Sequence, residues 1–67
     1  MNKTEKRECA KLMAFARANP NSAVAAGILA RALAAMVRSA ATTKSRNELV
    51  TFAAGWPDVV SHPDFIV

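Results

Sequence analysis

The chain has 67 residues, which is room for a single domain, and its apolar share of 52% is too high for a disordered segment. One cysteine and one histidine exclude an intramolecular disulfide and a structural zinc site built from this chain alone. The net charge is +4, but all nine basic residues lie within residues 1–46, whereas residues 47–67 carry three acids and no base. This polarity favours either an acidic partner at the first two-thirds of the chain or a head-to-tail alignment of chains.

A first helix is expected at about residues 4–18. Thr4 is the expected N-cap, and Glu5 follows where a negative charge complements the helix dipole. Phe15 lies at the edge of the apolar face, and the face expected to meet the core comprises Cys9, Leu12, Met13 and Ala16. Because the residues before this helix are mostly polar and lack the apolar region of a signal peptide, we expect a cytoplasmic protein, in which a lone thiol stays reduced.

A second helix, at about residues 22–41, is the element around which the chain is organised. The Asn19–Ser22 turn is short enough to make the first two helices an antiparallel hairpin. One wide apolar face of the second helix comprises Ala25, Leu29, Leu33, Met36, Val37 and Ala40. A second apolar patch, made by Val24, Ile28 and Ala35, lies beside Arg31 and Arg38. The central Arg31 argues against a membrane span, since an arginine there costs about 2.5–3.5 kcal/mol.

A third helix is expected at about residues 45–54. Ser45 and Glu48 have the spacing of a capping box, in which each side chain accepts a hydrogen bond from a free backbone N–H. Gly55 supplies the C-terminal stop, and Trp56 is placed to pack back onto the last turn.

The tail, residues 56–67, contains Pro57 and Pro63, and each proline could open a short helical turn followed by an aspartate. The tail ends in three apolar residues, Phe65, Ile66 and Val67. We expect either a strap laid over the helices or an arm inserted into a partner.

Little in the sequence supports catalysis. Cys9 and His62 are the candidates for a nucleophile and a base, but Cys9 falls on an apolar face, and His62 stands between Ser61 and Pro63 where a capping role suffices. With two glycines in the chain there is no phosphate-binding loop. We expect neither an enzyme nor a cofactor, a metal or a small-molecule substrate.

Nucleic-acid binding is the alternative function. The second and third helices could form a helix-turn-helix, which would place four polar residues at the start of the recognition helix: Lys44, Ser45, Arg46 and Asn47. A solvated, capped first turn explains the same residues.

Protein binding is the function that the sequence favours. The candidate contact residues are the arginines, aromatic residues and surplus apolar residues typical of interface centres, namely Phe15, Val24, Ile28, Arg31, Arg38, Trp56 and Phe65. The sequence therefore predicts an all-α, three-helix domain with an irregular or briefly helical tail. We expect it to act as a small adaptor, inhibitor or regulator, and as a homodimer through the second helix.

Overall fold

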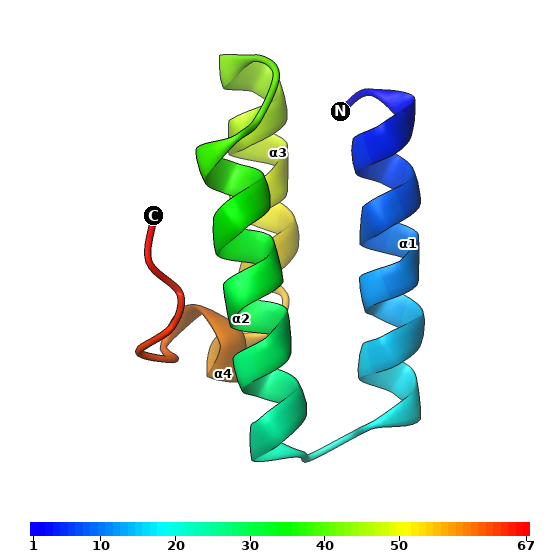
Figure 1. Ribbon diagram of the computed structural model, residues 1–67, viewed down its shortest axis with the longest axis vertical. Coiled ribbons are helices and arrows are strands. Elements are labelled where there is room, and N and C mark those ends of the chain that lie inside the picture. The colour runs from blue at the N-terminus through cyan, green and yellow to red at the C-terminus, as the bar shows by residue number, and fades with distance from the viewer.

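A computed structural model describes residues 1–67, and it confirms the all-α prediction (Figure 1). Three long helices, α1 (Lys3–Ala18), α2 (Ala23–Arg38) and α3 (Thr43–Ala54), precede a single helical turn, α4 (Pro57–Val60). Consecutive long helices run antiparallel, so the expected hairpin and third helix are both present. No helix combines the length and hydropathy needed to cross a bilayer.

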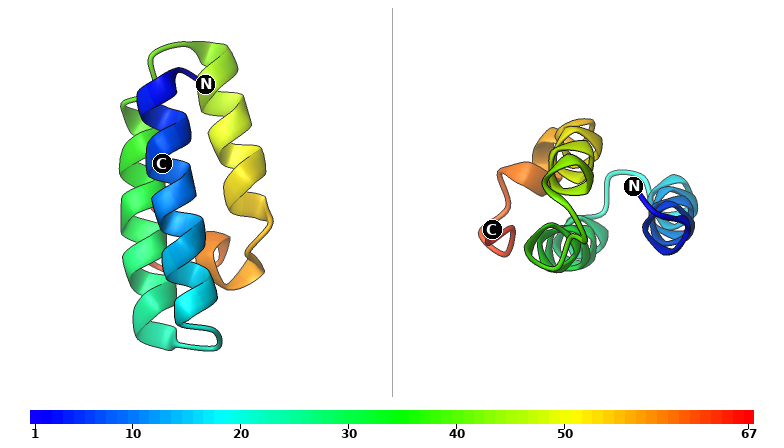
Figure 2. Two further views of the ribbon diagram at one scale, coloured as in Figure 1. Left: turned by 90° about the vertical axis from the view of Figure 1, so that its right-hand side faces the viewer. Right: turned by 90° about the horizontal axis from the view of Figure 1, so that it is seen from above.

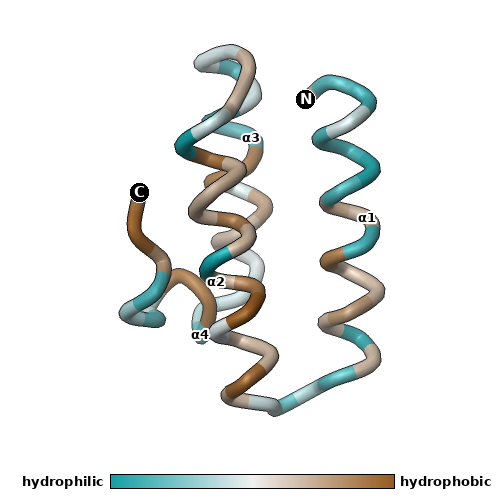
Figure 3. The backbone as a smooth tube through the Cα atoms, in the orientation of Figure 1, coloured by the Kyte–Doolittle hydropathy of each residue, from teal (hydrophilic) through white to brown (hydrophobic).

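The second helix is the centre of the molecule. Figure 2 shows α1 and α3 on two sides of α2, and the backbones of both contact α2 without contacting each other. The short α4 packs against α2 and α3. Figure 3 shows that the first turns of α1 are hydrophilic, whereas α2 carries hydrophobic residues along most of its length. Burying α2 among three neighbours therefore holds the fold together.

The core consists of two clusters. One joins α2 to α3 and α4 through Leu29, Ala30, Leu33, Ala53 and Val59. The other joins all three long helices through Cys9, Val37 and Leu49. Of the wide face expected on the second helix, Ala25, Leu29, Leu33 and Val37 are buried, while Met36 and Ala40 are half-buried. Alanine at positions 30, 34 and 53 is fully buried, which lets neighbouring helices approach closely.

The predicted N-cap of the first helix is wrong. Asn2, not Thr4, caps α1: its side chain accepts a hydrogen bond from the Glu5 N–H at 2.8 Å, and its own N–H donates to Glu5 Oε1 at 2.9 Å. This pair is a capping box, and it places the N-cap two residues earlier than expected. It allows α1 to begin at Lys3.

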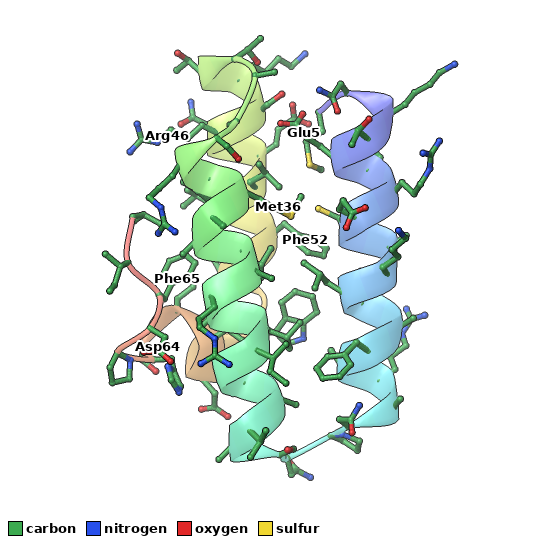
Figure 4. All side chains as sticks on the ribbon, in the orientation of Figure 1. Glu5, Met36, Arg46, Phe52, Asp64 and Phe65 are labelled. Atoms are coloured by element: carbon green, nitrogen blue, oxygen red, sulfur yellow. The ribbon has the colours of Figure 1, made fainter.

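The same carboxylate explains why the second helix is shorter than the predicted range of 22–41. Glu5 is buried, points from α1 toward the α2–α3 loop (Figure 4), and accepts a hydrogen bond from the Ala41 N–H at 3.3 Å. The Ser39 hydroxyl donates to the Ala35 carbonyl at 2.8 Å, and Ser39 is the C-cap. The Ser39 N–H still donates to the Ala35 carbonyl at 3.0 Å, but the Ala40 N–H donates three residues back, to the Val37 carbonyl at 3.4 Å. Helix α2 therefore ends at Arg38, and the Glu5 side chain takes the place of a backbone acceptor for Ala41.

The predicted capping box of the third helix is also wrong. Thr42 is the N-cap, since its hydroxyl accepts from the Ser45 N–H at 3.0 Å, and α3 begins at Thr43. Ser45 is buried inside the first turn. Glu48 does not reach back to a backbone N–H; its Oε1 lies 2.8 Å from the Met1 ammonium instead.

The end of the third helix agrees with the sequence. Gly55 is the C-cap, and the rings of Phe52 and Trp56 meet edge to face with centroids 4.9 Å apart. Pro57 opens α4, and Asp58 lies in its first turn. Residues 61–67 then lie alongside α2, so the tail is a strap over the chain's own helices (Figures 1 and 2).

Acid should weaken this fold through Glu5. Hydrogen bonding from the Asn2 N–H is the main cause that lowers its pKa from 4.5; burial opposes this, and hydrogen bonds from Ala41 and Ser45 add to it. A lowered folded-state pKa gives stability that is complete above the unfolded value and is lost as pH falls through the folded value. We expect the melting temperature to decrease as the pH is lowered from about 4.5.

Glu5→Gln should flatten this pH dependence, as measured by thermal denaturation followed by circular dichroism at a series of pH values. Some dependence will remain, because the Met1 ammonium likewise lowers the pKa of Glu48. An unchanged acid profile in Glu5→Gln would show that Glu5 does not link protonation to folding.

Candidate protein-binding surface

One face of α2 contacts no other helix and stays exposed, although the tail runs along its edge. Its exposed residues are spaced alternately by four and three positions, and we call them the α2 stripe: Val24, Ile28, Arg31, Ala35 and Arg38. Val24 is 75% exposed and Ile28 is 39% exposed. This spacing is that of the seam through which two helices pair in a coiled coil.

Both arginines of the stripe hold the tail. Arg31 Nη1 lies 2.8 Å from Asp64 Oδ2, and Arg38 Nη1 donates a hydrogen bond to the Ile66 carbonyl. These bonds place Ile66 near the C-terminal end of α2, with 66% of its surface exposed. Because the Arg31–Asp64 pair is solvent-exposed, it fixes the position of the strap more than it stabilises the fold.

A glycine on α2 also allows the tail to pack closely against this helix. Gly27 is buried, and a Cβ atom at this position would stand 3.3 Å from His62 Nε2. The His62 ring in turn accepts a hydrogen bond from the Asp64 N–H at its Nδ1 atom, at 3.0 Å. The histidine thus caps a turn of the strap and fits against the glycine.

Three of the seven predicted contact residues pack inward instead. Phe15, Trp56 and Phe65 are half-buried, and each contacts the cluster around Leu33. Figure 4 shows Phe65 in the strap beside α2. The other four, Val24, Ile28, Arg31 and Arg38, lie together on the α2 stripe.

The structure does not bring the two candidate catalytic residues together. Cys9 is on α1, which lies on the opposite side of α2 from the strap that carries His62 (Figure 1). Burial, followed by the charges of Glu5 and Glu8, raises the pKa of the Cys9 thiol, and a raised pKa makes the thiol less reactive. No three His, Cys, Asp or Glu side chains cluster as metal ligands would.

The residues of the nucleic-acid alternative are divided. Lys44, Arg46 and Asn47 are exposed at the start of α3, whereas Ser45 is buried. Helices α2 and α3 lie antiparallel, side by side, whereas the two helices of a helix-turn-helix cross at about 90–120°.

Several residues that shape this surface were not anticipated from the sequence. Asp64, Gly27 and the Ile66 carbonyl position the strap, but their partners lie far away in the chain. Glu5 was expected only to face the helix dipole, although the Asn2-to-Glu5 spacing matches a capping box as well as Ser45-to-Glu48 does.

Comparisons with protein-family models, with curated proteins and with solved structures find no match to this chain.

Proposed function

We propose that this chain is a small, non-enzymatic protein-binding protein, an adaptor, inhibitor or regulator, and that it self-associates through the α2 stripe. One observation carries the proposal: the central helix, covered elsewhere by its own chain, leaves Val24 and Ile28 exposed at the spacing of a helix-pairing seam. Surface apolar residues arranged in this way mark interaction sites more often than isolated ones do.

A second copy suits the stripe because the stripe is self-complementary in an antiparallel pair. Such a pair sets Ile28 of one copy against Ala35 of the other, and Val24 against the aliphatic stem of Arg38. Arg31 then meets its own counterpart at the two-fold axis. The Arg31–Asp64 ion pair within each copy reduces the repulsion that this meeting would cause.

The action on a partner would be steric or conformational, since binding alone needs no reactive group. The N-terminal two-thirds of the chain, which carries all nine basic residues, would attract acidic partners.

Ile28→Asp should convert the dimer to a monomer, as measured by light scattering or sedimentation across a concentration series. A carboxylate buried at the seam loses its hydration, and the neighbouring Arg31 is already paired with Asp64, so self-association should weaken by at least about tenfold. Val50→Asp is the matched control, because Val50 is 42% exposed but lies on α3. A monomer at every concentration, or equal effects of the two substitutions, would contradict self-association through the stripe.

A further inference from the structure

A second surface lies on the other side of the molecule, along the seam between α1 and α3. The two backbones do not contact each other, and two hollows of about 690 and 390 Å³ share Phe52 on this side of the molecule. The first lies between Met1 and α3, and the second lies between α1 and the end of α3. The first hollow is lined by Met1, Lys44, Asn47, Glu48, Thr51 and Phe52. The second is lined by Met13, Ala16, Arg17, Phe52, Gly55 and Trp56. We call the two together the α1–α3 groove.

The floor of the groove is apolar and only partly covered. Phe52 lies between α3 and α1 (Figure 4), and its edge-to-face contact with Trp56 makes a firm aromatic base. Met13 is half-buried, yet it packs against neither core cluster. Methionine fills irregular gaps and adapts to a ligand, so Met13 and Met1 suit a surface that receives another side chain.

The walls of the second hollow carry small residues. Ala16 on α1 and Gly55, the C-cap of α3, both line it, and small residues let a helix backbone approach closely. Helix α3 has 12 residues and is therefore about 18 Å long. A partner helix of three or four turns would fill the groove and complete a four-helix arrangement.

The charge of the groove is positive at both ends. Lys44 and Arg17 stand at opposite ends and take part in none of the ion pairs of the structure. Glu48 is the one acid in the lining, and the Met1 ammonium neutralises it at 2.8 Å. The hydrogen bond from the Met1 ammonium lowers the pKa of Glu48, and the charges of Lys44 and Lys6 add to this effect. A helix that enters this groove therefore gains from carrying acidic residues beside its apolar face.

We infer that the α1–α3 groove binds an acidic amphipathic helix of a partner protein. The inference rests on the proposed function only in taking protein binding as the activity, since it uses different residues from the α2 stripe. The apolar side chains of the partner would contact Met13, Phe52 and Trp56, and its carboxylates would pair with Arg17 and Lys44. Such helix-in-groove binding is a recurring mode of peptide recognition.

The test uses two synthetic helical peptides, each about three heptads long, with leucine at the seam positions. One has glutamate at the flanking positions and the other has lysine, and both are checked to be monomeric. Fluorescence anisotropy with the full chain should show micromolar binding of the glutamate peptide that weakens with added salt, and binding of the lysine peptide at least about tenfold weaker.

Variants then locate the site. Arg17→Glu with Lys44→Glu should weaken binding of the glutamate peptide by about tenfold or more and strengthen binding of the lysine peptide. Arg7→Glu with Arg46→Glu is the matched control, because it changes the net charge equally at exposed residues outside the groove, and Arg46 points away from α1 (Figure 4). Met13→Ala should weaken binding of the glutamate peptide without changing the net charge of the protein. Circular dichroism checks that every variant is folded.

Four outcomes would overturn the inference. The first two are that neither peptide binds and that both bind equally well. The third is that the control variant, Arg7→Glu with Arg46→Glu, loses as much affinity for the glutamate peptide as the groove variant does. The fourth is that a mixed-sequence DNA duplex binds at the groove in place of the peptide. Light scattering separates the inference from the proposed function. If Arg17→Glu with Lys44→Glu changes the association state, the groove is an interface between copies and the inference fails. If only Ile28→Asp changes the association state, self-association through the α2 stripe is supported, whether or not the peptides bind.

Discussion

Leu33→Ala is expected to destabilise the protein by about 2–5 kcal/mol, which is the range for leucine truncation in a packed core. Leu33 is fully buried at the middle of α2, in the cluster that joins this helix to α3 and α4. Leu12 and Phe15 of α1 pack against the same cluster. The substitution therefore removes contacts with all the other helices at once.

The consequence should be large because so small a domain has little stability to lose. Domains of this size shift their melting temperature by about 4–8 °C for each kcal/mol, so tens of degrees are at stake. Urea and thermal denaturation followed by far-ultraviolet circular dichroism measure the change. Val50→Ala, at a position 42% exposed, should cost about 1 kcal/mol or less. Equal effects of the two substitutions would mean that Leu33 is not at the centre of the core.

The arrangement of the long helices could be predicted because local chemistry and periodicity agree. The Asn19–Ser22 turn ends one helix and caps the next; Asn21 takes the left-handed conformation, at φ 60°, and Ser22 accepts from the Ala25 N–H. The positions Ala25, Leu29, Leu33 and Val37 repeat at helical spacing, and all four are buried. Each of these signals depends on residues within a few turns of one another.

The helix starts could not be predicted because contacts distant in sequence decide them. Several acceptable caps stand within three residues at both sites, and local preference hardly separates Asn2 from Thr4 or Thr42 from Ser45. Two remote bonds favour the observed choices: Glu5 accepts from Ala41, 36 residues away, and Glu48 pairs with the Met1 ammonium, 47 residues away. The sequence shows each acid, but not the group that it will meet.

Of the two candidate surfaces, one could be predicted from the sequence and the other could not. The α2 stripe follows from the spacing of residues on one helix, so Val24 and Ile28 could be found from the pattern. The α1–α3 groove depends on how far apart two helices stand on a third, and no periodicity reports that separation. Met13 was expected on the face that meets the core, and it has that position, but it lies beside an open seam.

Enlarging a buried alanine is the opposite change from truncating Leu33, and it measures whether the core can accommodate a larger side chain. Ala30 is fully buried in the same cluster as Ala53 of α3, which is also fully buried. A leucine at position 30 must displace one of the neighbouring helices or adopt a strained rotamer. We expect Ala30→Leu to destabilise the protein by about 1–3 kcal/mol.

The matched control for Ala30→Leu is Ala14→Leu, at an exposed position of α1, which should stay within about 0.5 kcal/mol of the parent. Alanine and leucine have similar helix propensities, so a difference between the two variants reports packing. Denaturation in urea gives both free energies of unfolding. If Ala30→Leu were neutral while Leu33→Ala remained costly, α2 and α3 would be packed loosely enough to accept a larger side chain. If both are costly, the alanines set the distance between α2 and α3, and the positions of the α2 stripe and the α1–α3 groove depend on that distance.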